Sequence, residues 1–561
     1  MSTEHPELEL PLEALSEHSL DPPRAAVRPP ARTDYSRGTP SRAAWSIHDK
    51  THLQCSLIYR ARKVRGKLEL KEQFEWEAYF FVPDSFRLDS QTYKQDDIYA
   101  DLKSYVRLAS REEPLRELLG APLERLRSAL AGTPDQAMNG MRLMACLLRD
   151  ALASAERHIM SGISAAHEHA RVSSKPGAGE VEKSGVLERP GSQLPKKLSP
   201  SLTAQIRKAV DVGPKVLNQL MLDLRVSDQR RRELPEREAQ TLLTASDWVR
   251  SEVSLQFEAF FGRVALRLGR LKGPPELVSA LTEAALLSAE ARRDCELKLE
   301  LSGALQPDRV EHFEFQRHVL KRFTSSVLWL KTRISEPGRW VRHALYGLAA
   351  GAAMSFAVGA ALWNGVNPGD QLMPWLVAAV IVYVVKDRLK AVLQETLSSA
   401  VARHFPDRSW EILDKTNRRV ATVNEQSGFV PFDQVDADVL TARRRTRQHS
   451  IEEVARPETV LHHKKTFTLY SERLAELGPD FDGLAEIFRL DVQRWLAHTD
   501  DPKQSVVLAD LETRRIRGYK APRVYNIAVA YRLRYADEES DWHRLRVVVS
   551  RKGLKRIDRI D

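Results

Sequence analysis

Cysteine is scarce in this chain. Only three cysteines occur among 561 residues, Cys55, Cys146 and Cys295, and no two of them form a CxxC motif. Three distant cysteines cannot supply the disulfide framework of a small secreted domain, so they favour a reducing compartment. The first residues, MSTEHPELELPLEALSEH, contain early acids and no apolar core of the signal-peptide kind. We therefore expect no cleavable leader.

Signatures of common enzymes and metal sites are also missing. The chain has no GxxxxGK[ST] loop, no GxSxG elbow, no GxGxxG motif and no HExxH motif. Its paired histidines lack a second ligand pair at metal-site spacing: His48/His52, His167/His169 and His462/His463. We expect no cofactor and no metal. These absences lower the expectation of catalysis without excluding a site assembled from scattered residues.

The chain has fewer acidic than basic residues, and its formal net charge is +10. Such an excess suits anionic lipid or nucleic acid. Two clusters stand out, Arg230–Arg232 and Arg443–Arg445 with Arg447, and neither contains interleaved aromatic residues for stacking on bases. They predict a solvated face or a lipid contact, and they make nucleic acid an unlikely partner.

Long apolar runs occur only between residues 344 and 385. The run Ala344–Trp363 has 20 uncharged residues, and a polar turn separates it from the shorter run Leu372–Val385. A bilayer requires about 20 apolar residues in a helix whose hydrogen bonds are closed internally. The pair predicts a transmembrane helical hairpin over 336–390, with spans at about 341–363 and 370–388. The second run is short and contains Pro374, so a re-entrant segment or a buried soluble hairpin stays open.

Basic residues flank both runs, whereas the turn contains one acid and no base. The positive-inside rule then places both termini in the cytoplasm of a multi-pass membrane protein. The same side chains can also contact anionic lipid headgroups. These residues are Lys331, Arg333, Arg339, Arg342, Lys386, Arg388 and Lys390.

Small residues recur four apart in the first run, at Gly347, Gly351, Ser355 and Gly359. On a helix they share one face, and small residues let a second helix approach closely. This face predicts helix packing. Its partner is either the second helix of the same hairpin or a second copy of the chain in a homo-oligomer.

The rest of the chain divides by composition and periodicity into segments of different character. The fold class we expect is α+β and predominantly helical. The hairpin lies between a strand-plus-helix N-terminal cytoplasmic lobe and a small α+β C-terminal cytoplasmic lobe. The strand-forming pieces at 50–82 and 505–550 could join one sheet. The segments are a disordered tail 1–45, a β-rich segment 46–98, a helical segment 99–171, a flexible linker 172–199, a helical region 200–335, the hairpin 336–390, a juxtamembrane helix and loops 391–465, and the C-terminal lobe 466–561.

Three stretches carry a family resemblance: YFFVPDSFRLDSQTYKQDDIYADLKSYVRL, HFEFQRHVLKRFTSSVLWL and VVKDRLK. Together they resemble an uncharacterised group of bacterial two-helix membrane proteins. The resemblance rests on 56 of the 561 residues. It implies an architecture and a bacterial inner membrane, and it transfers no functional residue.

These observations lead to two expectations about function. The first is a non-enzymatic scaffold, sensor or partner-recruiting protein at the membrane, with a protein partner of unknown identity. The alternative is a membrane-bound enzyme acting on a phosphorylated or lipid substrate through the C-terminal lobe. Its first candidate residues are Asp480, Asp482, His462, His463 and Arg523. A membrane-tethered nucleic-acid binder is the less likely third class.

Overall fold

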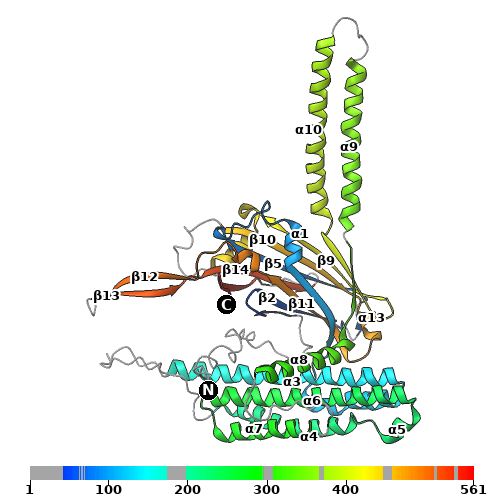
Figure 1. The fold of residues 1–561 in the computed structure, drawn as a ribbon, viewed down its shortest axis with the longest axis vertical. Coiled ribbons are helices and arrows are strands. Elements are labelled where there is room, and N and C mark those ends of the chain that lie inside the picture. Colours follow the sequence, from blue (N-terminus) through cyan, green and yellow to red (C-terminus); the bar gives the residue numbers. More distant parts are fainter. Residues whose placement is uncertain are drawn as a thin grey trace, which may run out of the picture.

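The computed structural model describes residues 42–61, 63–64, 67–68, 70–173, 198–293, 295, 307–335, 337–364, 372–445, 458–510, 515–535 and 541–560. The tail expected over 1–45 and the linker expected over 172–199 lie almost entirely outside these residues. Figure 1 shows three parts in succession: a helical bundle, a sheet domain beside it, and a projection of two long helices that rises from the sheet domain.

An eight-stranded antiparallel sheet forms the larger layer of the sheet domain. In spatial order its strands are β16 (Gly553–Arg559), β15 (His543–Ser550), β14 (Tyr525–Tyr535), β5 (Glu72–Pro83), β10 (Glu458–Leu469), β9 (Arg419–Val430), β8 (Arg408–Leu413) and β7 (Lys331–Ser335). Because β5 pairs with both β10 and β14, strands from the two ends of the chain share this sheet.

A four-stranded antiparallel sheet forms the second layer. Its order is β1 (Arg42–Ile47), β2 (His52–Arg60), β11 (Phe481–Asp491) and β6 (Leu102–Ser110). From Leu53 to Tyr59 every second residue of β2 is buried, which is the pattern of a strand with one face in a core. Side chains of both sheets meet in one hydrophobic cluster, in which the ring of Trp45 lies 6.2 Å from that of Trp76 and 6.4 Å from that of Phe488.

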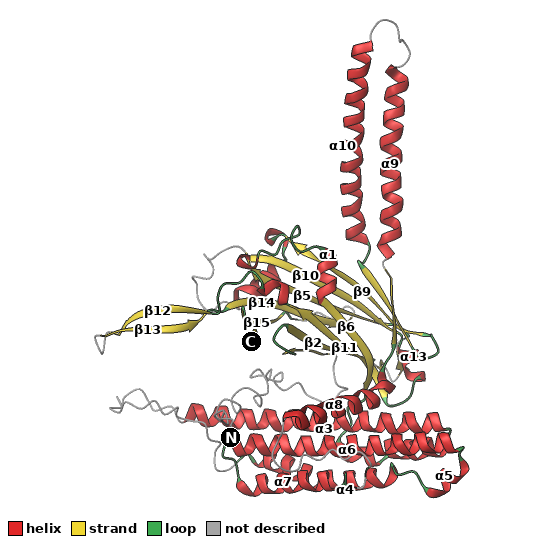
Figure 2. Ribbon diagram, viewed as in Figure 1, coloured by secondary structure: helices red, strands yellow, loops and turns green. Residues whose placement is uncertain are grey.

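Short elements complete the sheet domain. A two-stranded ribbon leaves its side (Figures 1 and 2). A helix on the outer face of the larger sheet contacts β14 and β15. The ribbon consists of β12 (Lys503–Asp510) and β13 (Arg515–Pro522), and the helix is α11 (Ala437–Arg445). The remaining elements are β3 (Lys63–Val64), β4 (Lys67–Leu68), η2 (Asp84–Phe86), α1 (Gln95–Asp101), η5 (Phe432–Gln434), α13 (Ser471–Glu476) and α14 (Gln493–Leu496).

The helical bundle has a core of its own. Its helix α6 (Glu236–Arg270) buries Val249, Val253, Phe257, Phe260 and Phe261. This three- and four-residue spacing places them on one side of the helix. The bundle elements are η3 (Leu115–Leu119), α2 (Ala121–Ala131), α3 (Pro134–Ser173), α4 (Pro200–Asp223), α5 (Asp228–Glu233), α6 (Glu236–Arg270), α7 (Pro275–Glu290) and α8 (Pro307–Ser325).

The projection is inserted between two neighbouring strands of the larger sheet. After η4 (Ser326–Leu328) the chain forms β7, rises as α9 (Pro337–Asn364), returns as α10 (Leu372–His404) and enters β8. Strands β7 and β8 are hydrogen-bonded partners, and the two helices lie against each other along their length (Figure 1). Both ends of the projection are therefore held at one edge of the sheet.

The prediction of a transmembrane hairpin with two membrane-spanning helices is wrong. Among the described residues only one helix contains an 18-residue window long and apolar enough to cross a membrane, His343–Ala360 in α9. The first 18 residues of α10 do not meet this criterion, because they include the three charged residues Lys386, Asp387 and Arg388. The multi-pass topology expected from the sequence is accordingly not supported.

The division into an N-terminal and a C-terminal lobe is also wrong. The chain is α+β with 30% strand, and its two larger sheets mix strands from both halves of the sequence. Two stretches whose residue pattern predicts helices contain strands instead: FDGLAEIFRLDVQRWLAHT at 481–499 and the start of the helical segment 99–171. Residues 481–491 form β11 and residues 102–110 form β6, and these two strands pair with each other. In β11 the buried Glu486 interrupts an otherwise apolar alternation, which concealed its period of two.

Candidate functional site

Strand β10 places four consecutive basic residues, HHKK at 462–465, on two opposite faces of the larger sheet. Successive side chains of a strand point to opposite faces. His463 and Lys465 consequently point into the layer between the sheets, where both are buried, and His462 and Lys464 point outward. Each pair is the centre of a polar cluster.

The inner cluster surrounds Lys465, whose side chain is completely buried. Its Nζ lies 2.7 Å from the Glu425 carboxylate on β9, contacts the Glu486 carboxylate on β11 and donates to Ser104 Oγ on β6 at 2.7 Å. The cluster thus joins the two sheets. Burial disfavours the charged amine, but the charges of the two glutamates outweigh burial and raise the pKa of Lys465.

Further donors satisfy the two carboxylates. Tyr59 OH donates to Glu486 Oε2 at 3.0 Å, and Trp410 Nε1 donates to Glu425 Oε2 at 3.1 Å. Burial, reinforced by the charge of Glu486, raises the pKa of Tyr59 well above its ordinary value. One lysine therefore faces two carboxylates in a medium without bulk water, and neutral donors stabilise the remaining negative charge.

His463 borders the inner cluster. Its Nδ1 is hydrogen-bonded to Ser427 Oγ, and its ring stacks on Phe488 with centroids 5.2 Å apart. Burial, together with the nearby charge of Lys465, lowers the pKa of His463 well below its ordinary value. The imidazole is consequently neutral at pH 7.

The outer cluster surrounds Glu77 at the centre of the larger sheet. Its carboxylate lies 2.9 Å from His462 Nε2 and 2.6 Å from the guanidinium of Arg532, and it accepts a hydrogen bond from Tyr79 OH at 3.1 Å. Burial alone would raise the pKa of Glu77, but hydrogen bonds from His462 and Arg532 outweigh burial and hold this pKa at about 2. His462 and Arg532 remain about one-fifth exposed, so this cluster reaches solvent.

The five residues considered for catalysis do not form one site. His462 and His463 lie on opposite faces of β10. Arg125 of α2 donates to Asp480, and Arg60 of β2 pairs with Asp482. The fifth, Arg523, is 2.7 Å from Asp500 at the base of the ribbon. Each has its own partner. The Asp480 contact joins the sheet domain to the bundle.

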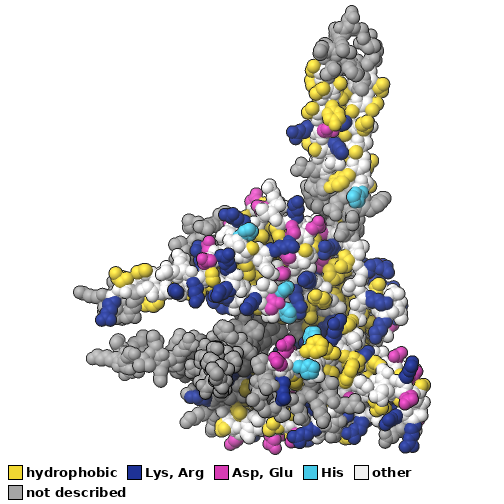
Figure 3. Space-filling model, in the orientation of Figure 1, with side chains coloured by type: hydrophobic (Ala, Val, Ile, Leu, Met, Phe, Trp, Pro, Cys, Tyr) yellow, Lys and Arg dark blue, Asp and Glu magenta, His cyan; other side chains and the backbone are white. Residues whose placement is uncertain are grey.

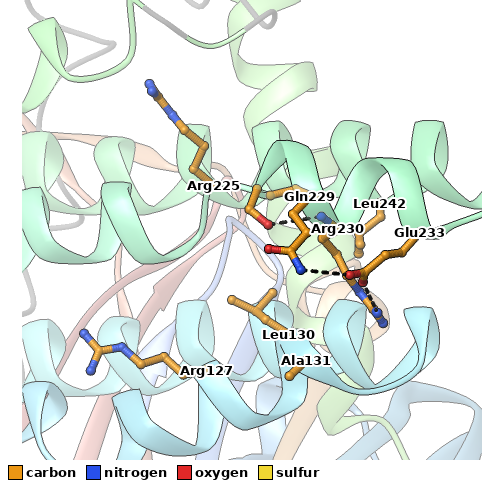
Figure 4. Close-up of a pocket in the computed structure, with 10 residues that line it drawn as sticks. Arg127, Leu130, Ala131, Arg225, Gln229, Arg230, Glu233 and Leu242 are labelled. Atoms are coloured by element: carbon orange, nitrogen blue, oxygen red, sulfur yellow. Dashed lines mark hydrogen bonds and ion pairs between the residues drawn. The ribbon is translucent and has the colours of Figure 1, made fainter.

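A cavity of about 350 Å³ lies at the end of the bundle and includes one of the predicted basic clusters (Figure 4). Arg127, Arg225 and Arg230 line it together with Glu233. Arg230 lies 3.2 Å from Glu233 and donates to the carbonyl of Gly132, and Arg127 pairs with Glu124 and Asp223. Acids balance the arginines, so the cavity does not present a strongly cationic surface.

The remaining basic and histidine pairs have local roles. Arg443 donates to Glu458 at 2.9 Å, Arg231, Arg232 and Arg444 are exposed, and the side chains of Arg445 and Arg447 lie outside the described part of the chain. His52 Nδ1 lies 2.9 Å from Asp49. Within the described residues no three His, Cys, Asp or Glu side chains gather as a metal site requires.

The projection presents a surface unlike that of the rest of the molecule. Large apolar side chains of α9 and α10 face outward: Leu348, Met354, Phe356, Val358, Leu362, Val377, Val380, Ile381, Tyr383, Val384, Val385 and Val392. Figure 3 shows lysine and arginine side chains part of the way down the projection among these hydrophobic side chains. Lys386 lies 4.0 Å above the ring of Tyr383, and Arg388 and Lys390 are exposed nearby.

The small residues of α9 face away from α10. A Cβ added at Gly347, Gly351 or Gly359 would meet nothing within 4 Å, and Ser355 is exposed. Instead, α9 has Ala349 and Ala353 buried at 1% and 2% exposure. This leaves the predicted packing face free of α10, so self-association through it stays a prediction.

The basic residues that flank the apolar runs divide between the sheet and the projection. Lys331 and Arg333 lie on β7, where Lys331 Nζ donates to Asn417 Oδ1 at 3.1 Å and Arg333 lies 3.6 Å from Glu411. Arg339 and Arg342 lie near the start of α9, and their side chains fall outside the description. These positions neither test nor contradict a role in lipid contact.

Sequence reasoning missed the centres of both polar clusters. Glu77, Glu425, Lys465 and Glu486 were not singled out, because each interrupts a largely apolar stretch and no local motif connects them. The available signal was that interruption itself, since a charge at an inward position of a strand requires a buried partner. No family model, curated protein or solved structure matches this chain, so the resemblance to bacterial two-helix membrane proteins stays an expectation.

Proposed function

We propose that this protein is a non-enzymatic scaffold attached to a membrane through the projection of α9 and α10. The apolar outer surface of α9 carries the proposal. Leu348 and Leu362 are 66% and 69% exposed, and the candidate span His343–Ala360 is only 11% buried. An exposed apolar surface of this length is costly in water and stable in lipid.

The position of the projection supports a scaffolding role. Helix α8 of the bundle continues through η4 into β7, and Trp329 bridges to Arg107 of the smaller sheet on the way. Strand β7 ends at Ser335 and α9 begins at Pro337, so a single residue separates them. Bundle, sheets and projection are thus connected in succession, and an attached membrane fixes the orientation of the whole molecule.

Charge and chain path support the orientation. The chain enters and leaves the projection at paired strands, so the bundle and the sheet domain lie on one side of the membrane. Lys386, Arg388 and Lys390 favour the cytoplasmic side and contact with anionic headgroups. The resemblance noted above favours the bacterial inner membrane. Support for a scaffold over an enzyme comes from the separation of the five candidate catalytic residues.

Membrane flotation of the full chain tests the proposal. The double variant L348E/L362E places two charges on the exposed surface of α9, and we expect it to leave the membrane fraction. The matched control is L222E/L266E, because Leu222 and Leu266 in the bundle are 66% and 64% exposed. The control should float with the membranes like the natural chain. Flotation of L348E/L362E at the natural level would contradict attachment through α9.

A further inference from the structure

The ribbon of β12 and β13 exposes apolar side chains on both of its faces. Val507 and Ile516 share one face and are 66% and 79% exposed, and Leu508 and Tyr519 share the other at 56% and 48%. Within the described residues β12 and β13 pair only with each other, so both outer edges are free. An isolated two-stranded ribbon is marginally stable in water. These features indicate that another segment covers the ribbon.

The ribbon is also basic. Residues 503–522 contain five Lys and Arg against two acids. Lys503, Arg515 and Lys520 are exposed, and no ion pair is formed by any of them within the described part of the chain. Free edges, exposed apolar groups and uncompensated bases together suit an extended, acidic segment that contains leucines.

This chain contains such a segment near its N-terminus. Residues 4–21 hold six acids and no lysine or arginine, and residues 7–13, ELELPLE, alternate acid and leucine with one proline. This alternation is the pattern of a strand with one apolar face. A proline is tolerated on an edge strand, where its missing N–H costs no ladder hydrogen bond.

We propose that residues 4–21 dock on the basic ribbon and add a strand to one of its free edges. The leucines lie beside Leu508 and Tyr519 on one ribbon face, and the acids lie beside Lys503 and Lys520 on the other. Backbone hydrogen bonds at the edge supply affinity, as in other cases of strand addition. The described chain starts in β1, which packs beside β16, and Arg551 at the β15–β16 turn lies 2.9 Å from Asp501 at the base of the ribbon. The 20 residues between 21 and 42 can span up to about 70 Å when extended, which is ample for this path.

Two other occupants fit less well. Nucleic acid would neutralise the bases but leave Val507, Leu508, Ile516 and Tyr519 in water. A membrane reached by the projection lies in a different direction, because the ribbon extends sideways from the sheet domain and the projection rises at a steep angle to it (Figure 1).

Amide hydrogen exchange of the full chain in lipid nanodiscs tests the docking. Reversing three acids, in the variant E7K/E9K/E13K, should speed exchange in residues 503–510 and 515–522 by roughly tenfold, as expected when an ordered edge is released. Reversing the two lysines of one ribbon face as well, with K503E/K520E, should restore protection. The control E180K/E182K/E188K makes the same charge change elsewhere in the chain and should leave ribbon exchange unchanged.

Two results would overturn the proposal. One is equal exchange of the ribbon in the natural chain and in E7K/E9K/E13K. The other is protection of the ribbon in a chain lacking residues 2–21 by duplex DNA at physiological salt, which would assign the ribbon to nucleic acid instead. The outcome is independent of the flotation experiment, because none of the variants used for hydrogen exchange alters α9.

Discussion

The interior of the sheet domain buries charged side chains, whereas the surface of the projection exposes apolar ones. Lys465, Glu425 and Glu486 are at most 4% exposed between the two sheets. On α9, Leu348 and Leu362 are about two-thirds exposed. Soluble proteins rarely bury charges without partners and rarely expose long apolar surfaces.

The difference lies in where each region finds its partners. Every charge of the inner cluster is matched inside the chain, by an opposite charge, a hydroxyl or an indole N–H. The apolar side chains of the projection have only the facing helix, and much of their surface has no partner in the described structure. A buried charge therefore points to internal architecture, and an exposed apolar helix points to an external environment.

Removing Lys465 should have the largest effect on stability. The variant K465M leaves two buried carboxylates without their cation, and we expect a loss of about 3–5 kcal/mol in the free energy of unfolding. Urea unfolding of the full chain, followed by tryptophan emission, measures this loss. Its neighbour Lys464 serves as the control, because it is 36% exposed and pairs with Glu75 at 3.1 Å. K464M should cost under about 1 kcal/mol, and equal losses for the two variants would contradict the assigned faces.

Removing the charge of Glu77 should have the second-largest effect. E77Q replaces a carboxylate bound by Arg532 and His462, and we expect a loss of about 2 kcal/mol at pH 7. Because the folded pKa of Glu77 is held at about 2, below the ordinary value of 4.5, the unfolded chain binds more protons between these values. This contribution is present above pH 4.5 and is lost as the pH falls towards 2. The stability difference between the natural chain and E77Q should shrink over that range, and a constant difference would contradict the ion pair.

A substitution on the open face of α9 should have the smallest effect on stability. In G351L the new side chain meets open space, so the unfolding free energy should be nearly unchanged. If a second copy uses this face, G351L should weaken self-association of the chain in liposomes, measured by energy transfer between labelled copies. A352L, also at an exposed position, is the control. Unchanged energy transfer in G351L would leave the small-residue face without a role in oligomerisation.

Local patterns predicted the elements whose residues repeat without interruption. The helical region that contains α6 and the apolar run of α9 both follow from spacing along a few turns. Prediction failed where one polar residue broke the period. Glu486 interrupts the alternation of β11, so the sequence predicted a helix there. The sequence also predicted a helix for β6, the strand that pairs with β11.

The polar clusters could not be predicted for a different reason. Glu77 and Arg532 are 455 residues apart, and Tyr59 and Glu486 are 427 apart, so no local pattern connects them. The five candidate catalytic residues were grouped because all of them lie in the C-terminal part of the chain. Successive side chains of β10 point to opposite faces of the sheet, so His462 and His463 cannot share a site although they are neighbours in the chain.

The sequence by itself determined the apolar projection, the basic residues beside it and the helical bundle, because helix periodicity and hydrophobic length are local properties. Only the tertiary structure decided that strands from both ends of the chain form the same sheets, that β7 and β8 hold the projection, and that α9 turns its glycines away from α10. These features depend on which distant edges and faces meet. Backbone hydrogen bonding between strands and the burial of side chains select those partners across hundreds of residues, and no short stretch of sequence records the choice.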